Sequence, residues 1–234
     1  MDIFGLAFRD YMQGTPDGVI RVSTNVAEEE ELPVAYFFRS YDQMPEWERL
    51  ALNECRGRVL DVGAGAGSHA LVLQDRGLTV CAIDLSAGAV EVMKARGVKD
   101  ARRRDFFRFS GESFDTMLFL MNGAGMAASL KRLKNMLLHA VSLLRPGGCI
   151  LMESTDLIYL YEEEDGSVLI PMANKYYGEV DYRLSYKEHR AKGFPWLFVD
   201  PGHLTHLAGS CGLQTEILYV GEAYNYLAKL SMSP

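Results

Sequence analysis

The sequence of 234 residues has no long apolar run, no excess of basic residues and no closely spaced cysteines. The lack of an 18-residue apolar run argues against a membrane-spanning helix, and Asp2 is unlike the basic start of a signal peptide. A formal net charge of −7 argues against duplex nucleic acid, whose phosphates require a basic face. We therefore expect a cytoplasmic protein whose partner is neither a nucleic acid nor a membrane.

The four cysteines stand far apart in the chain, at Cys55, Cys81, Cys149 and Cys211. Without a C-x-x-C pair they indicate buried thiols in a reducing compartment rather than a zinc site or a disulfide framework. The composition, 48% hydrophobic and 24% charged, is that of a soluble globular protein. A chain of this length fits one domain of ordinary size with room for an insertion.

The chain is organised around a glycine-rich stretch. Residues 59–62 have the pattern of a short buried strand, and three glycines follow at alternate positions, Gly63, Gly65 and Gly67. Glycine lets the backbone turn sharply and bring N–H groups close to a ligand, because no Cβ intervenes. A helix pattern begins behind the loop at Ser68, and a helix N-terminus adds unpaired donors and a positive dipole end. The stretch therefore predicts a cofactor-binding loop.

This pattern also satisfies the G-x-G-x-x-G/A fingerprint of dinucleotide sites, with Asp84 standing 19 residues after Gly65. Asp61 favours a different ligand, because a carboxylate at the end of a buried strand is costly unless something binds it. An acid there would repel a pyrophosphate, whereas a cationic ligand would neutralise it. Residues 61–67 resemble motif I (D-x-G-x-G-x-G) of the class I S-adenosylmethionine-dependent methyltransferases, whose cofactor carries an ammonium and a sulfonium.

The resemblance implies a set of contacts with S-adenosylmethionine. Asp84, just past the second strand, would accept the ribose hydroxyls, and Leu85 would pack on the adenine. Asp105 would accept the adenine amino group, with Phe106 against the ring. The whole set of expected cofactor-binding residues is Asp61, Gly63, Ala64, Gly65, Gly67, Asp84, Leu85, Asp105, Phe106, Met121 and Asn122.

The end of the predicted fourth strand, residues 114–121, narrows the chemistry. Methyltransferases acting on planar amines or amides carry Asn or Asp followed by Pro-Pro-aromatic here, whereas Asn122 is followed by Gly123 and Ala124. Metal-dependent catechol methylation needs acidic oxygen ligands at this position, so an amide predicts no metal. Asn122 and the Met121 carbonyl would lie near the transferring methyl; the alternative is that Asn122 only opens the turn.

From residue 59 onward strand and helix patterns alternate, which predicts a parallel sheet with helices on both faces. The third strand, residues 98–104, would be a sheet edge protected by its arginines, Arg102 to Arg104. An L-R-P-G-G turn at residues 144–148, which recurs in the resembled family, precedes a fifth strand at 149–153. Final strands at 214–220 and 224–230 complete a doubly wound, mostly parallel α/β sheet of order 3-2-1-4-5-7-6, its last strand antiparallel.

Residues 1–44 form a predicted N-terminal helical cap, and residues 45–234 the methyltransferase domain. The cap has a helix at residues 3–12, a loose strand at 19–26 and an acidic run at 28–31, expected as a solvated loop. An N-terminal element often closes over the cofactor in this family, so Tyr36 and Arg39 are candidates to contact its methionine end or the substrate. The alternative is an aromatic cluster that packs the first helix onto the sheet.

An insertion at residues 156–200 is expected to carry specificity, because it is rich in aromatic residues. Its aromatic residues are Tyr159, Tyr161, Tyr176, Tyr177, Tyr182, Tyr186, Phe194, Trp196 and Phe198. Alternation at residues 178–188 predicts an antiparallel hairpin over the strand ends, and residues 162–166 an exposed turn. The aromatics form either a substrate lid, with Trp196 as a substrate contact, or the contact of a homodimer; the chain is thus a monomer or a homodimer.

The expected function is in-line transfer of a methyl group to an O, N or S nucleophile of a small molecule. A sulfonium is already activated, so a base is needed only if the nucleophile arrives protonated. None of His69, Glu153, His203 and His206 stands out, and no catalytic residue is assigned. Two alternatives remain open at this point: a non-catalytic S-adenosylmethionine-binding module and an NAD-dependent oxidoreductase.

Overall fold

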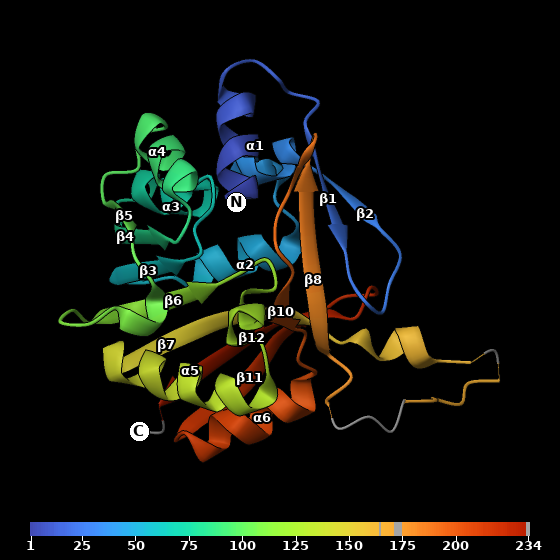
Figure 1. Ribbon diagram of the computed structural model, residues 1–234. Coiled ribbons are helices and arrows are strands. Elements are labelled where there is room, and N and C mark those ends of the chain that lie inside the picture. The colour runs from blue at the N-terminus through green and yellow to red at the C-terminus, as the bar shows by residue number, and fades with distance from the viewer. Residues whose placement is uncertain (164, 171–174, 233–234) are drawn as a thin grey trace.

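The computed structural model describes residues 1–163, 165–170 and 175–232, and these contain a central sheet of seven strands (Figure 1). Its strands are β3 (Arg58–Val62), β4 (Thr79–Asp84), β5 (Ala101–Arg103), β6 (Phe114–Phe119), β7 (Leu144–Thr155), β11 (Leu213–Val220) and β12 (Asn225–Met232). They lie in the order β11-β12-β7-β6-β3-β4-β5. Within this sheet, the pairs formed by β3 to β7 are parallel, and β12 pairs antiparallel with both β7 and β11. Numbered along the chain, this is the predicted order 3-2-1-4-5-7-6.

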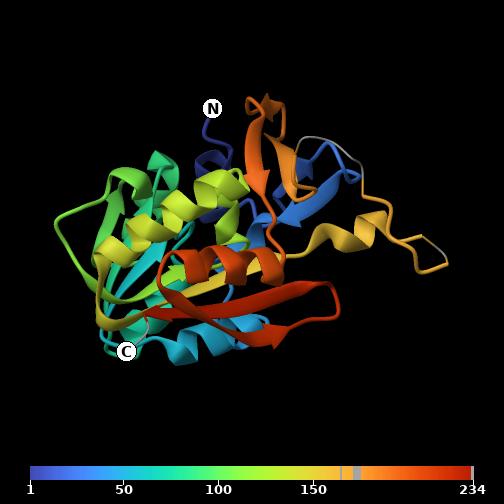
Figure 2. The ribbon, with the colours of Figure 1, turned by 90° about the horizontal axis from the view of Figure 1, so that it is seen from below.

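Helices cover both faces of this sheet, because successive side chains of a strand point to opposite faces. Val59 packs in the layer with α2 (Glu46–Glu54), α3 (Ser68–Asp75) and α4 (Ala87–Ala95). Leu60 packs in the layer with α5 (Leu130–Leu143) and α6 (Pro201–Ser210). Figure 2 shows α2 on the side of the sheet opposite to α5 and α6. Asp61 therefore points to the α2 and α3 side, two residues along from Val59.

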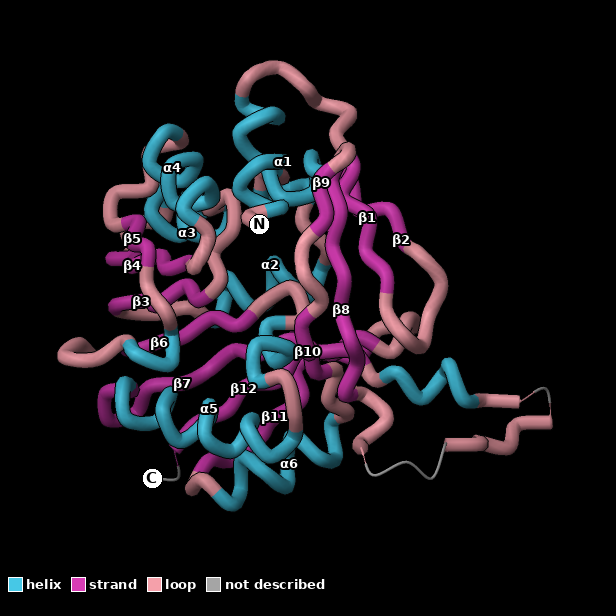
Figure 3. The backbone as a smooth tube through the Cα atoms, in the orientation of Figure 1, coloured by secondary structure: helices cyan, strands magenta, loops and turns pink. Residues whose placement is uncertain are grey.

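A second, antiparallel sheet joins the N-terminal segment to the insertion (Figure 3). Its strands are β1 (Val19–Ser23), β2 (Glu30–Pro33), β8 (Glu179–Tyr186), β9 (His189–Arg190) and β10 (Phe194–Leu197). They lie in the order β10-β8-β1-β2, with β9 on β8, and Ile20 stands opposite Tyr186. The predicted cap and the predicted lid thus share one sheet.

The helix predicted at residues 3–12 is α1 (Ile3–Met12), which packs on α4. The contact is close, since a Cβ on Gly88 would lie 2.5 Å from the Cα of Gly5. Asp2 caps α1 by accepting the Gly5 N–H at 2.9 Å, and it also accepts from the Ser86 hydroxyl at 2.8 Å. Short 3-10 helices complete the fold: η1 (Val34–Phe38), η2 (Tyr41–Gln43), η3 (Phe106–Arg108), η4 (Gly123–Ala127) and η5 (Leu157–Tyr161).

Four predicted boundaries were wrong. The strand predicted at residues 19–26 ends at Ser23. The acidic run at 28–31 is not simply a loop, because β2 begins at Glu30 and pairs with β1, where Arg21 forms ion pairs with Glu29 and Glu31. The edge strand β5 spans only three residues. β7 begins at Leu144 rather than at residue 149, since the L-R-P-G-G segment continues the pairing with β6 after a register shift.

From η5 to residue 170, the described residues of the insertion extend away from the body of the molecule (Figure 1). Of the turn predicted at residues 162–166, residue 164 lies outside the described residues; on either side of it, the Glu163 N–H donates to the carbonyl of Ser167 and Glu162 bridges to Val168. No helix in the described ranges is long and apolar enough to cross a membrane.

Candidate functional site

The glycine loop leaves β3 with three residues in the left-handed backbone region. Gly63, Gly65 and Gly67 have φ angles of +73°, +56° and +82°, which side chains rarely tolerate. At Gly67 space is also lacking, since a Cβ would lie 2.8 Å from the side chain of Val98. The alternating glycines are therefore explained by the backbone that this turn requires.

The backbone N–H groups of the loop are used within the protein. Gly63 and Ala64 both donate to the carbonyl of Ile83, at 2.9 and 3.1 Å, and Gly65 donates to Asp84 Oδ2 at 2.9 Å. The sequence predicted bare donors, but the structure uses these three to fasten the loop to β4. The loop thus offers a ligand close backbone approach more than free hydrogen-bond donors.

Asp61 is the most unusual residue of the loop region, with only 3% of its surface exposed. Its Oδ2 atom makes no hydrogen bond with any described residue. Burial raises its pKa to about 6, with a smaller contribution from the charge of Asp84, while His69 acts in the opposite direction. A buried carboxylate oxygen without a partner is destabilising, and a cationic ligand would relieve that penalty. This arrangement fits the charged methionine end of S-adenosylmethionine.

Asp84 lies beside the loop at the end of β4. Its two carboxylate oxygens accept the N–H groups of Gly65 at 2.9 Å and Ser86 at 2.8 Å. Burial raises its pKa, and these two hydrogen bonds partly offset that effect. Leu85, next to it, is 65% exposed and presents apolar surface. The residues expected to bind the ribose and the adenine therefore stand together at one strand end.

Asp105 and Phe106 follow the edge strand. Asp105 caps η3 by accepting the Phe107 N–H at 3.0 Å. The Phe106 ring is buried, with Phe119 and His139 as ring neighbours at 5.1 and 5.0 Å, whereas Phe107 is 36% exposed. Phe106 thus presents its ring to the core, and the more accessible ring beside it belongs to Phe107.

A turn with unusual backbone ends β6. Met121 and Asn122 both have positive φ angles, +54° and +57°, although neither is glycine. The Met121 N–H donates to Glu153 Oε2 at 2.6 Å, and the Thr155 hydroxyl donates to Asn122 Oδ1 at 3.0 Å. Burial raises the pKa of Glu153 to about 7.

Beneath the N-terminal segment lies a buried ion cluster. Arg39 binds both carboxylate oxygens of Glu48, at 2.8 and 3.0 Å, and its guanidinium covers the Tyr36 ring at 3.4 Å. His69 Nε2 lies 2.8 Å from the same carboxylate. Burial opposes the charge of Glu48, but His69 and Arg39 outweigh it and lower its pKa. Likewise, Glu48 and Asp61 raise the pKa of His69 against the effect of burial.

The cluster brings Tyr36 and Arg39 together and ties Arg39 to Glu48, an acid that was not among the predicted site residues. The signal was available, because Glu48 shares the buried side of α2 with Ala51 and Leu52. An acid on the apolar side of a helix predicts a buried partner.

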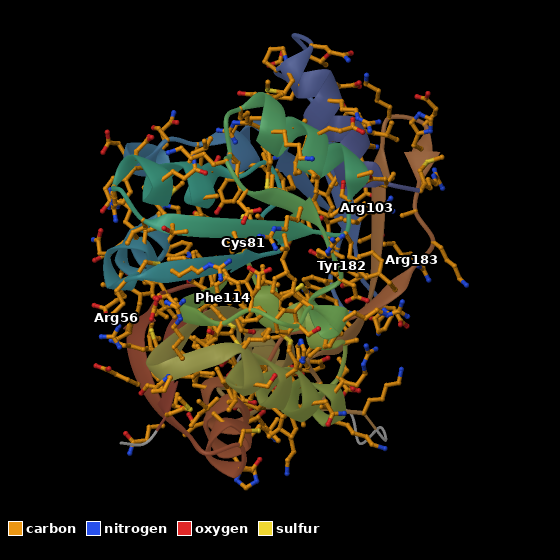
Figure 4. All side chains as sticks on the ribbon, turned by 90° about the vertical axis from the view of Figure 1, so that its left-hand side faces the viewer. Arg56, Cys81, Arg103, Phe114, Tyr182 and Arg183 are labelled. Atoms are coloured by element: carbon orange, nitrogen blue, oxygen red, sulfur yellow. The ribbon has the colours of Figure 1, made fainter. Side chains whose placement is uncertain are left out.

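The aromatic face of β8 and β10 stands over η4. Trp196 lies against Gly125, where a Cβ would come within 2.0 Å of the indole. Tyr182 lies on the same side of the sheet, 5.7 Å from Trp196 between ring centroids, and Figure 4 shows it on the side of β8 opposite to Arg183. At the next residue of η4, the Met126 sulfur would lie 3.8 Å from a Cβ on Gly63. The segment after β6 therefore lies between the glycine loop and the aromatic wall.

No group of three or more His, Cys, Asp or Glu side chains suited to a metal occurs in the described part of the chain.

Comparison with known proteins places this site in a family. The family model described as a methyltransferase domain matches residues 59–148. A S-adenosylmethionine-dependent methyltransferase from Bacteroides fragilis, crystallised with S-adenosyl-L-homocysteine, is 44% identical; the match covers 100% of this chain and 95% of that one, with a TM-score of 0.92. No curated protein matched.

Two more distant structures share the fold. The sugar N-methyltransferase KedS8 from Streptoalloteichus is 17% identical, with a TM-score of 0.60 and coverage of 91% of this chain and 98% of that one. The amino pentose methyltransferase CalS10 from Micromonospora echinaspora is 13% identical, with a TM-score of 0.58 and coverage of 82% and 94%.

The sheet order and the buried acid at the glycine loop define a class I methyltransferase fold. With the 44% identical relative, they establish that the chain belongs to the S-adenosylmethionine-dependent methyltransferases and uses that cofactor. This membership decides against both alternatives left by the sequence, the nicotinamide enzyme and the non-catalytic module.

Proposed function

We propose that the protein methylates an O, N or S nucleophile of a small molecule by in-line displacement, with the acceptor bound against the aromatic face of β8 and β10. The observation that carries this proposal is the contact of Trp196 with Gly125, because it sets the aromatic face one short segment away from the glycine loop. Aromatic side chains recognise ring or apolar surface, which argues for an acceptor of that kind.

In the proposed site Asp61 neutralises the positive charge of the cofactor, Asp84 binds its ribose and Asp105 its adenine. Leu85 and the accessible Phe107 ring, in place of the core-facing Phe106, supply apolar surface, while Tyr36 and Arg39 border its methionine end or the acceptor. When bound, S-adenosylmethionine supplies a methyl group that its sulfonium already activates. The protein then has to orient the nucleophile and exclude water.

The cap, residues 1–44, and the insertion, residues 156–200, act together as the cover of this site in our proposal. Phe8 and Phe37 support this role, because each lies within 3.9 Å of the position of a Cβ on Gly65. The insertion also carries exposed apolar side chains, at Val168, Leu169 and Ile170. These support the alternative, a homodimer contact. Light scattering of the purified protein distinguishes a monomer from a dimer. A cytoplasmic location completes the proposal, supported by four free thiols.

The test is methyl transfer from labelled S-adenosylmethionine to a panel of small molecules, followed by identification of the labelled product. Amino sugars belong in the panel because KedS8 and CalS10 are named for such acceptors. Trp196→Ala should raise the KM for the acceptor at least tenfold and leave S-adenosylhomocysteine affinity within threefold. Label transferred only to a protein or nucleic acid would contradict the proposed small-molecule acceptor.

A further inference from the structure

The segment that follows β6 holds three non-glycine residues in left-handed backbone. These are Met121, Asn122 and Ala128, with φ angles of +54°, +57° and +64°. Such conformations are unfavourable for residues with a Cβ and persist only where the surroundings impose them; they concentrate at functional sites. The three left-handed conformations therefore point to neighbouring groups that hold this segment in place.

Two side chains of β7 hold the first two of these residues. Glu153 and Thr155 are two residues apart and so lie on the same face of the strand. Glu153 accepts the Met121 N–H at 2.6 Å, and Thr155 donates to Asn122 Oδ1 at 3.0 Å. Further along, the Gly125 N–H donates to the carbonyl of Asn122 at 2.9 Å, which continues the turn into η4.

Glu153 is an unexpected residue for a purely structural hydrogen bond. It is 5% exposed, and no described cation lies within ion-pair distance of it, because Arg39 and His69 both pair with Glu48 instead. A buried carboxyl without a cation is destabilising. Its retention under a strained turn points to a functional benefit.

The benefit is visible at two neighbouring residues of η4, Gly125 and Met126. The Met126 sulfur approaches Gly63 on the cofactor side, and Gly125 lies under the Trp196 indole on the acceptor side. Gly123 is equally confined, since a Cβ there would lie 2.9 Å from the Cβ of Phe119. A shift of the turn at Met121 would therefore move the contacts with both the glycine loop and the aromatic wall.

We propose that Glu153 is a positioning residue of the methyl-transfer site, whose carboxyl holds the turn at Met121 and Asn122 so that η4 fixes the glycine loop relative to the aromatic wall. This proposal rests on the proposed function, with Met121 and Asn122 beside the cofactor as the family resemblance implies. In this role Glu153 acts as a hydrogen-bond acceptor, through the Oε2 atom that binds the Met121 N–H.

The experiment compares Glu153→Gln and Glu153→Leu. A glutamine keeps an acceptor oxygen for the Met121 N–H, whereas a leucine of similar size does not. Glu216→Leu on β11 is the matched control, because Glu216 is exposed on the same sheet. Amide hydrogen exchange rates of residues 119–128 in the free protein measure how firmly the turn is held. Calorimetric titration with S-adenosylhomocysteine measures the affinity of the cofactor site.

We expect Glu153→Leu to accelerate exchange at residues 119–128 at least tenfold and to weaken S-adenosylhomocysteine binding at least tenfold. Glu153→Gln and Glu216→Leu should stay within threefold of the wild type in both. If Glu153→Leu does not fold, Thr155→Val takes its place; it should accelerate exchange of the same segment at least threefold and weaken binding about threefold.

Three outcomes would overturn the proposal. The first is unchanged exchange in Glu153→Leu, or in Thr155→Val where that variant replaces it. The second is faster exchange with unchanged S-adenosylhomocysteine affinity, which would make the hold structural only. The third is a Glu153→Gln variant as defective as Glu153→Leu, which would mean that the carboxyl acts through its charge or proton. Failure of the wild type to bind S-adenosylhomocysteine would count instead against the proposed cofactor site, so the two failures are distinguishable.

Discussion

Three buried carboxyl groups around the glycine loop differ in what neutralises them. Glu48 binds Arg39 and His69, and its pKa is lowered despite burial. Asp61 and Glu153 have no such partner, and burial raises their pKa to about 6 and about 7. The site therefore holds acidic groups that ionise more readily when a cation arrives, which is the electrostatic basis for binding a positively charged cofactor.

Replacing Asp61 by alanine should weaken S-adenosylmethionine binding by tenfold to about 150-fold, corresponding to the loss of about 1.5–3 kcal/mol from a charge-assisted contact. The fold should survive, because the side chain has no partner on Oδ2 to lose. Calorimetric titration measures the affinity, and Asp42→Ala, at an exposed acid of η2, is the control. Unchanged affinity in Asp61→Ala would refute the assigned role.

The raised pKa of Asp61 also predicts how stability depends on pH. The Asp61 carboxyl binds its proton more tightly in the folded protein than in the unfolded chain. Ionisation of Asp61 therefore lowers the free energy of unfolding progressively as the pH rises from 3.8 to about 6. Asp61→Asn should therefore gain stability relative to the wild type across that window, by up to about 1.4 kcal/mol per pH unit, and level off above it. Urea unfolding of both proteins at a series of pH values gives the difference. A difference that stays constant with pH would show that the pKa is not raised.

At the scale of elements, η4 is confined by glycines. Gly125→Ala would place a Cβ 2.0 Å from the Trp196 indole, so the indole has to move. We expect a loss of about 1–3 kcal/mol of stability and a shifted fluorescence spectrum of Trp196. The measurement is made in a Trp47→Phe background, because the chain has two tryptophans.

Gly209→Ala in α6 is the control for this substitution, since nothing lies within 4 Å of a Cβ there and alanine favours a helix. An unchanged Trp196 spectrum in Gly125→Ala would argue against the contact that defines the proposed acceptor wall.

The N-terminal helix is joined to the domain through Asp2. This side chain caps α1 and also accepts from Ser86 and Gly88 at the start of α4. Asp2→Ala should lower the free energy of unfolding by about 1–2 kcal/mol and the melting temperature by about 2–8 °C. Asp2→Asn keeps an acceptor oxygen and should lose less than half of that. Equal melting temperatures for wild type and Asp2→Ala would show that α1 does not depend on this cap.

The elements of the central sheet could be predicted from the sequence because their signals are local. The run at residues 59–62, the three glycines and the final pair of strands each identify themselves within a few residues. The second sheet could not, because Ile20 pairs with Tyr186 and no local pattern sets that register. For the same reason the acidic run at 28–31 predicts a loop, although Arg21 on the neighbouring strand forms ion pairs with Glu29 and Glu31.

The site residues also divide into those with a local sequence signal and those set by packing between distant segments. Asp61 and Asp84 were identifiable because strand ends fix where they lie. Phe106 and Phe107 are adjacent on a 3-10 turn, and only packing against Phe119 decides which ring is buried. The hydrogen bond from Met121 to Glu153 joins the turn after β6 to β7, and neither segment alone predicts it.

For the whole molecule, ligand binding and folding are linked. A ligand at one hundred times its dissociation constant adds about 2.7 kcal/mol, which raises the melting temperature of a chain of this size by roughly 5–11 °C. We expect such a shift with S-adenosylhomocysteine and none with NAD. Thermal denaturation monitored by circular dichroism checks it, and the reverse pattern would contradict the cofactor assignment.

The strand β1 emerges from the ribosome long before its partner β8, since their paired residues are separated by most of the chain. At about 5–20 residues per second, that interval lasts roughly ten to thirty seconds. During this interval the elements around the glycine loop can fold, while the edge of β1 that later pairs with β8 stays unpaired. The proposed acceptor surface can therefore form only after β8 and β10 have emerged, shortly before α6, β11 and β12 complete the central sheet, so both sheets of the enzyme are finished by the same last part of the chain.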